Sequence, residues 1–141
     1  MAVTHRMETE RNKDVVRQAY DALNQGEMER FGEFLAEDFR EVAQIGRARN
    51  KEEYLANFAD LRTMMPDVRF DIQEVIAEGD RVVVVENYSG TMTGEFKGLE
   101  SNGRRMSVTA VDIYRIMDGK LAEVLSVLDT ASVMEQLGLQ G

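Results

Sequence analysis

Two acidic residues occupy strand-like positions whose neighbours on the same face are apolar. Side chains alternate between two faces along a strand, so in residues 81–92 Glu86 shares its face with valine and tyrosine side chains. In residues 108–116 the same alternation places Asp112 on one face with Tyr114. A carboxylate among apolar neighbours is costly unless it is paired, hydrogen-bonded or protonated. Both acids are therefore candidates for acid/base chemistry in a pocket.

Each acid also has a purely structural interpretation. Asp112 could be satisfied by backbone amides, a buried tyrosine or water, and serve the shape of the protein alone. Glu86 could pair with an arginine, or a bulge in its valine-rich strand could turn it outward. If both side chains instead enter one cavity, their repulsion would raise the pKa of one of them and leave an acid/base couple.

Two of the four tyrosines could support such a couple. Tyr88 and Tyr114 could donate hydrogen bonds to a substrate carbonyl or enolate, although tyrosines on an apolar face often serve as core with the hydroxyl at a cavity rim. Tyr20 and Tyr54 lie on the apolar stripes of expected helices, which favours core packing for both. Tyr54 could in addition reach the mouth of the cavity.

The composition excludes several classes of function. The net charge of −9, from 26 acidic and 17 basic residues, argues against nucleic acid and anionic membranes as partners. The chain has no cysteine and one histidine, His5, which disfavours metal sites and Ser-His-Asp catalysis. No metal or cofactor is expected. Because no apolar run approaches the roughly 20 residues of a membrane span, and residues 1–11 do not resemble a signal peptide, we expect a cytoplasmic protein.

The pattern of apolar residues predicts a single α+β domain over residues 12–141, preceded by a disordered start over residues 1–11. Asn12 and Asn50 are expected helix caps, and Pro66 ends the helix that follows Asn50. After residue 67 the helical period changes to alternation, with tight turns at residues 78–80 and 118–119. Asp129 is expected to cap the last helix. The expected elements are helices over residues 13–24, 28–35, 51–65 and 131–137, and strands over residues 39–45, 68–77, 81–93, 104–117 and 120–128, with a loop over residues 95–103.

Several motifs in this order are similar to those of the SnoaL-like polyketide cyclases, within the NTF2-like superfamily. The resemblance covers almost the whole chain. It implies a cone-shaped α+β barrel, in which three N-terminal helices pack on a curved antiparallel sheet and a short helix ends the chain. It also implies a homodimer that packs through the sheet. The motifs are VRQAYDALNQGE (residues 16–27), AEDF (36–39), PDVR (66–69), AEGDRV (77–82), GTMTGEF (90–96), DIYRI (112–116), DGKL (118–121) and LDT (128–130).

The chain departs from this family at the residues that carry its chemistry. The aromatic polyketide cyclases have a histidine where this chain has Asp112, and their acid/base aspartate matches Ser126. The resemblance thus implies the fold and a hydrophobic cavity, while the family's mechanism does not transfer as it stands. Other histidines common in the family correspond here to Val42 or Ala43, Met92 and Val124.

The leading hypothesis is a cofactor-independent cyclase or isomerase that acts on a hydrophobic, polycyclic carbonyl metabolite by aldol-type acid/base chemistry. Asp112 and Glu86 are its predicted catalytic residues. A module that binds a small apolar ligand without catalysis, and a structural dimerisation domain, remain as alternatives. The predicted substrate-binding residues are Tyr88, Tyr114, Ser126, Met92, Val124 and Tyr54.

Overall fold

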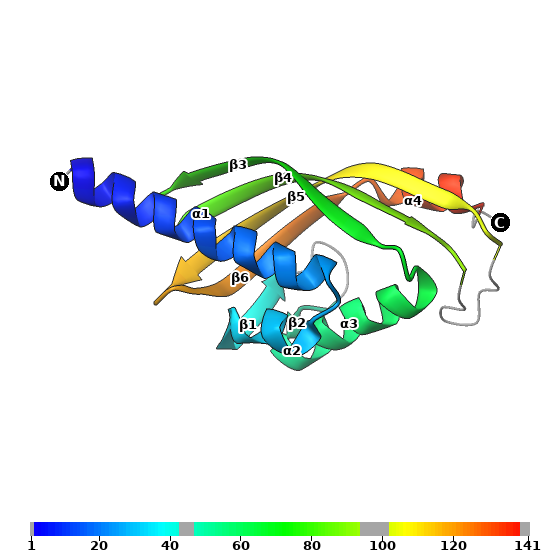
Figure 1. Ribbon diagram of the computed structural model, residues 1–141, viewed down its shortest axis with the longest axis horizontal. Helices are drawn as coiled ribbons and strands as arrows, with labels where there is room; N and C mark the ends of the chain where they lie inside the picture. Colours follow the sequence, from blue (N-terminus) through cyan, green and yellow to red (C-terminus); the bar gives the residue numbers. More distant parts are fainter. Residues whose placement is uncertain (1, 43–46, 94–101, 139–141) are drawn as a thin grey trace.

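The computed structural model describes residues 2–42, 47–93 and 102–138 of the chain, and in this part it has an α+β fold (Figure 1). Six strands form one sheet in the order β2-β1-β6-β5-β4-β3. β3 to β6 form an antiparallel meander, whereas β1 runs parallel to β6. The sheet curves around the helices without closing into a barrel. The elements are α1 (Ala2–Asn24), α2 (Met28–Glu33), β1 (Leu35–Val42), β2 (Arg49–Asn50), α3 (Lys51–Met64), β3 (Arg69–Glu78), β4 (Arg81–Thr91), β5 (Arg105–Met117), β6 (Lys120–Leu128) and α4 (Thr130–Leu137).

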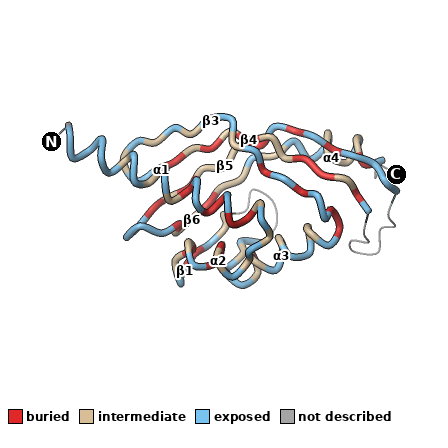
Figure 2. Tube along the Cα trace, in the orientation of Figure 1, coloured by how far each residue is buried: buried red, intermediate tan, exposed pale blue. Residues whose placement is uncertain are grey.

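The helices lie at different parts of the sheet. Figure 1 shows α1 lying along one face of the sheet, α2 and α3 beneath it, and α4 near the C-terminus. The buried residues concentrate where the helices meet this face, and the ends of the hairpins and the start of α1 are exposed (Figure 2). The space between α1, α3 and the strands is therefore the region in which side chains of both layers meet.

The first helix is longer than the sequence analysis predicted. Residues 2–11, expected to be disordered, continue α1 back to Ala2. This start is rich in good helix formers, and local contacts support it, including an ion pair between Lys13 and Glu10 at 3.3 Å. Asn12 does not cap the helix. Its side-chain amide instead donates a hydrogen bond to the Gly79 carbonyl at 3.3 Å, which ties α1 to the β3–β4 turn.

The first strand also differs from the prediction. β1 begins at Leu35, which was assigned to the second helix, because Leu35 pairs with Leu121 of the parallel strand β6. The predicted end of this strand, including Ala43, falls outside the described residues, as does most of the predicted loop over residues 95–103. The short strand β2 was not predicted. It exists through its antiparallel pairing with β1, in which Arg49 lies opposite Glu41.

The predicted helix boundaries around the third and fourth helices are confirmed. The Asn50 side chain accepts from the Glu53 amide at 2.9 Å, and the Glu53 carboxylate accepts from the Asn50 amide at 3.1 Å, which completes a capping box. α3 then ends at Met64, before Pro66. Asp129 caps α4 by accepting from the Ser132 amide at 3.0 Å.

Met65, which directly follows α3, packs closely against Gly90 of β4. A Cβ atom at Gly90 would lie 2.8 Å from the sulfur and 3.1 Å from the Cβ of Met65, which is fully buried. We expect Gly90→Ala to lower the free energy of unfolding by about 1–3 kcal/mol, because overpacking forces side chains off their preferred rotamers. Chemical denaturation measures this loss.

The same measurement on Met65→Ala and on the double variant separates the clash from a general effect of either change. The two changes should be non-additive, since the shorter side chain at position 65 removes the 2.8 Å contact with the sulfur and leaves only the 3.1 Å contact with the Cβ. Additive losses would contradict this close contact.

Candidate functional site

Both acids predicted from the sequence face the helices. Glu86 on β4 is buried, with 1% of its surface exposed. β4 and β5 pair without interruption from Arg81 opposite Arg115 to Thr91 opposite Arg105, so no bulge turns Glu86 outward. The irregularities of the meander lie elsewhere, one in β3 between Ile72 and Glu74 and one at the β5–β6 pairing. Glu86 and Asp112 sit diagonally on adjacent strands, because Glu86 pairs with Ala110 and Asp112 with Val84.

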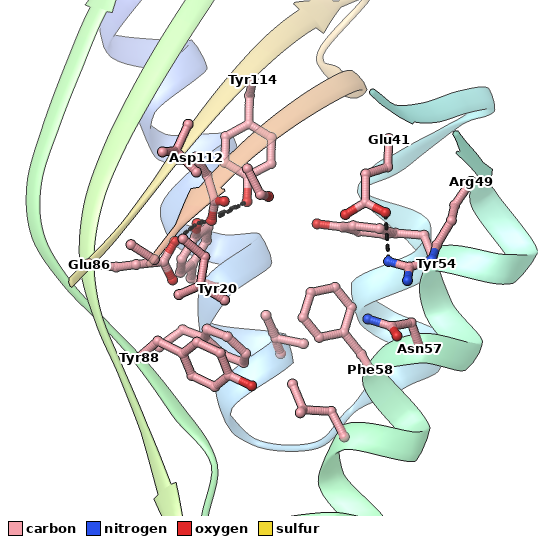
Figure 3. A pocket seen from close by; sticks show the side chains of 17 residues that line it. Tyr20, Glu41, Arg49, Tyr54, Asn57, Phe58, Glu86, Tyr88, Asp112 and Tyr114 are labelled. Atoms are coloured by element: carbon pink, nitrogen blue, oxygen red, sulfur yellow. Dashed lines mark hydrogen bonds and ion pairs between the residues drawn. The ribbon is translucent and has the colours of Figure 1, made fainter. Parts of the chain in front are cut away.

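One hydroxyl group joins the two acids. The Tyr20 Oη atom, carried by α1, lies 2.6 Å from Asp112 Oδ2 and 2.9 Å from Glu86 Oε1 (Figure 3). The Tyr114 hydroxyl lies 2.9 Å from Tyr20 Oη and 3.5 Å from Asp112 Oδ2. The two tyrosine rings meet edge to face, with their centroids 6.1 Å apart. The four side chains form a single hydrogen-bonded group, which we call the acid–tyrosine network.

Counting protons in this network requires one on an acid. The Tyr20 hydroxyl has a single proton, and its contact with Asp112 is the shorter one, so it donates to Asp112. The contact with Glu86 then needs a proton on Glu86, which donates to Tyr20 Oη, and Tyr114 donates to the same oxygen. Glu86 Oε2 is buried and has no hydrogen-bond partner in the described part of the chain. A neutral carbonyl oxygen tolerates this position far better than half of a carboxylate charge does.

Electrostatics favour the same protonation. Burial raises the pKa of Glu86 from its ordinary value of 4.5 to about 10, and hydrogen bonding to Asp112 and the charge of Asp112 add to the effect. The Tyr20 hydroxyl acts in the opposite direction but does not outweigh burial. At neutral pH Glu86 is thus a neutral acid, in agreement with the proton count.

The tyrosines keep their protons. Burial raises the pKa of Tyr20 and of Tyr114 well above the usual value of 10.0. The neighbouring acids raise the pKa of both further, as Tyr114 does for Tyr20 and Tyr54 does for Tyr114, while the hydrogen bond with Tyr20 acts in the opposite direction on Tyr114. Tyr88 is raised as well, by burial first and then by the charge of Glu86. All three phenols are consequently hydrogen-bond donors throughout the physiological range of pH.

The network forms one end of a cavity of about 230 Å³ between the sheet, α1 and α3. Aromatic rings make up much of its wall. The Phe70 and Tyr88 rings stack with centroids 4.8 Å apart, and Phe58 meets Phe70 and Tyr54 edge to face at 5.6 and 4.8 Å. Figure 3 shows Tyr88 on the side of the acids, and Tyr54 and Phe58 between the acids and the polar residues of β1, β2 and α3. A flat, largely apolar molecule suits such walls.

Six of the eight residues predicted for the site line this cavity. Ser126 lies opposite Asp112 in the β5–β6 pairing, next to the acids. Met92 and Val124 are also fully buried, but they lie in the core and are not part of the cavity wall. The six residues that line the cavity are Asp112, Glu86, Tyr88, Tyr114, Ser126 and Tyr54.

Sequence reasoning missed the central role of Tyr20. The residue does lie in the core, as its helical stripe predicted, with 2% of its surface exposed. A buried tyrosine hydroxyl needs a polar partner, and two buried acids need donors, so their coexistence was the available signal. The polar residues Glu41, Arg49 and Asn57 at the other side of the cavity carried no comparable signal.

Nowhere in the described ranges do three or more His, Cys, Asp or Glu side chains come together in a way that could hold a metal ion. No helix in this part of the chain is both long and apolar enough to cross a membrane.

Comparisons with known proteins agree with this fold. The sequence model of the SnoaL-like polyketide cyclases matches residues 13–137. IdmH, a candidate polyketide cyclase from Streptomyces antibioticus, is 26% identical with a TM-score of 0.79, over 90% of this chain and 98% of that one. AclR, a candidate hydroxylase from Streptomyces galilaeus, shares the fold with a TM-score of 0.85 at 21% identity, over 94% and 99% of the two chains. A candidate SnoaL-like polyketide cyclase from Jannaschia sp. CCS1 has a TM-score of 0.84 at 24% identity, over 94% and 95%. No curated protein matches the sequence.

The protonation of Glu86 predicts how stability changes with pH. Glu86 ionises near pH 4.5 in the unfolded chain but only near pH 10 in the folded protein, so its contribution to stability is complete below pH 4.5 and is lost as the pH rises towards 10. Gln mimics the protonated acid and cannot ionise. We expect Glu86→Gln to gain stability relative to the wild type by up to about 1.4 kcal/mol per pH unit in this window.

Chemical denaturation at several values between pH 5 and pH 9 measures the difference. Glu74→Gln, at an exposed position of β3, is the matched control and should follow the wild type. A parallel pH dependence for Glu86→Gln and the wild type would show that Glu86 is ionised in the folded protein.

Proposed function

Because the chain belongs to the SnoaL-like polyketide cyclase family, we propose that it is a cofactor-independent enzyme that cyclises or isomerises a hydrophobic, polycyclic carbonyl compound. The observation that supports this proposal is the acid–tyrosine network at the end of an aromatic cavity. The network contains a charged acid, a neutral acid and neutral phenols side by side, which are the groups that proton transfer next to a carbonyl requires.

Asp112 is the proposed general base. Tyr20 donates to its Oδ2 atom, and the Tyr114 hydroxyl, which donates to Tyr20, lies 3.5 Å from the same oxygen. The proposed acceptor of a proton from the carbon next to a substrate carbonyl is therefore Oδ1. Tyr20 holds the carboxylate in place, Tyr114 holds Tyr20, and Glu86 keeps its own proton, so only one acid in the network accepts.

Tyr88 is the proposed donor to the oxygen on which charge develops. Its side chain has no hydrogen-bond partner among the described residues, and its hydroxyl points into the cavity in Figure 3. Tyr114, the other candidate from the sequence, uses its hydroxyl within the network. A neutral phenol in a largely apolar site stabilises an enolate oxygen more strongly than water does.

The proposed reaction balances without a further reagent. The carboxylate of Asp112 takes a proton from the carbon next to one carbonyl, and the electron pair of that C–H bond forms the enolate. In a cyclisation, the enolate carbon attacks a second carbonyl carbon of the same molecule and forms a C–C bond. The resulting alkoxide takes the proton back from Asp112. The aromatic walls would hold the two carbonyl groups near each other and so raise their effective concentration.

Hydrogen–deuterium exchange tests this chemistry without knowledge of the natural substrate. We expect the protein to accelerate exchange of the protons next to the carbonyl of 1-tetralone in D₂O, followed by proton NMR. Asp112→Asn should lower the enzymatic rate at least about 100-fold, because an amide is a far weaker base than a carboxylate.

Asp71→Asn is the matched control, since Asp71 is exposed on β3 and pairs with Arg69 outside the cavity. Circular dichroism and thermal unfolding check that each variant is folded. An undiminished exchange rate in Asp112→Asn would eliminate the proposed base. Binding of 1-tetralone by the wild type without any exchange would instead favour a module that binds an apolar ligand.

We also propose that the protein forms a homodimer through the outer face of its sheet. Partly exposed apolar side chains form two rows on the face opposite the cavity, each made of residues that pair in register. Apolar patches of this kind commonly mark contacts between proteins. The rows are Val83, Ile113 and Leu125, which cross β4, β5 and β6, and Val85 and Val111, which cross β4 and β5, and Ile76 of β3 extends the first of them.

The dimer can be tested by one substitution in the middle of these rows. We expect Ile113→Asp to shift the protein from dimer to monomer in size-exclusion chromatography with light scattering, because a charge would be buried without a partner. Val3→Asp places the same charge at an exposed valine of α1 and should leave the dimer intact. A monomeric wild type would overturn the proposal.

A further inference from the structure

The cavity has a second polar end, which the proposed chemistry does not use. Glu41 on β1 and Arg49 on β2 lie directly opposite each other in the sheet, and Arg49 Nη1 donates to Glu41 Oε1 at 2.9 Å. Both side chains line the cavity, with 18% of Glu41 and 39% of Arg49 exposed. Figure 3 places this pair across the cavity from Asp112 and Glu86, with the aromatic side chains between them.

Asn57 of α3 belongs to the same end. It lies three residues after Tyr54 and one before Phe58, and all three side chains line the cavity. Among the residues that the structure describes, the Asn57 side chain makes no hydrogen bond and the Arg49 side chain bonds only to Glu41. Since a guanidinium carries five N–H donors, most of the donors of Arg49 remain available to a ligand.

The charges at this end select the kind of group that fits. Glu41 already neutralises Arg49, so a ligand carboxylate would gain little from the guanidinium and would be repelled by the nearby Glu41. A neutral hydroxyl group can accept a hydrogen bond from Arg49 or Asn57 and donate one to Glu41, which satisfies all the groups involved. Two further negative charges also disfavour an anionic ligand. They are the carboxylate of Asp112 at the far end of the cavity and the net charge of −9 of the whole chain.

We infer that Glu41, Arg49 and Asn57 form a subsite for a neutral hydroxyl group at the end of the substrate remote from the reacting carbonyl. The substrate is then an uncharged, flat compound with oxygen functions at both ends, such as a hydroxylated polycyclic ketone. This inference rests on the proposed function in taking the end at Asp112 as the reacting one. The subsite fixes the direction in which the substrate lies and places its carbonyl at the base.

Three probes of one shape test the subsite: 1-tetralone, 6-hydroxy-1-tetralone and 6-carboxy-1-tetralone. We expect the hydroxyl group to tighten binding to the wild type about tenfold, as a hydrogen bond to a charged group does. The carboxylate should bind more weakly than the hydroxyl compound. Isothermal titration calorimetry on the intact protein measures the three dissociation constants.

Two variants show which residues cause the tighter binding of the hydroxyl compound. Arg49→Met keeps the aliphatic stem and should weaken binding of the hydroxyl compound far more than binding of 1-tetralone, so that most of the advantage of the hydroxyl compound is lost. Asn57→Ala should remove a smaller part of it. Arg115→Met is the matched control, since Arg115 makes a comparable ion pair with Asp80 at 3.0 Å outside the cavity.

The inference is overturned if the hydroxyl compound binds no more tightly than 1-tetralone, if the carboxylate binds most tightly, or if the advantage survives Arg49→Met. These outcomes are distinct from a failure of the proposed function. Exchange of 1-tetralone depends on Asp112 and needs no group at the subsite, so either result can fail while the other stands.

Discussion

A single phenol hydroxyl in contact with two carboxyl groups is the interaction on which the site depends. Tyr20 reaches Glu86 and Asp112 across 66 and 92 residues of sequence, and it can do so only if α1 lies along the face of the sheet that both acids share. The contact also determines the protonation of the site, because one hydroxyl proton cannot serve two carboxylates. The geometry of the backbone and the charge of the cavity are thus set by the same contact.

The sequence predicted the faces of the strands and the two hairpins, but not the contacts between distant segments. The alternation that places Glu86 and Asp112 inward is local, because it needs only the period of a strand, and the uninterrupted β4–β5 register preserves it. The caps at Asn50 and Asp129 are local as well. Two other contacts depend on how distant segments meet. They are the hydrogen bonds from Tyr20 to the acids and the β1–β2 pairing that aligns Glu41 with Arg49. The sequence near these residues gives little indication of either contact.

The network carries a cost that a purely structural core would avoid. A buried glutamate with a pKa of about 10 must stay protonated at neutral pH, where the unfolded chain releases that proton, so the folded state is disfavoured relative to a chain with an uncharged residue there. Leucine or methionine would fill the space without this penalty. A buried acid next to a second acid and two phenols is therefore better explained by chemistry than by packing.

The arrangement also accounts for how acid/base chemistry could work without the histidines common in the family. A histidine near neutral pH supplies both a proton acceptor and a proton donor from one side chain. In the proposed mechanism the two roles are divided, because Asp112 accepts a proton and Glu86 keeps one, with Tyr20 between them. Such a division works only while water is excluded from the acids, since solvation would lower the pKa of Glu86 and ionise both. The aromatic wall of Phe70 and Tyr88 is consequently part of the chemistry, because it keeps the dielectric around the network low.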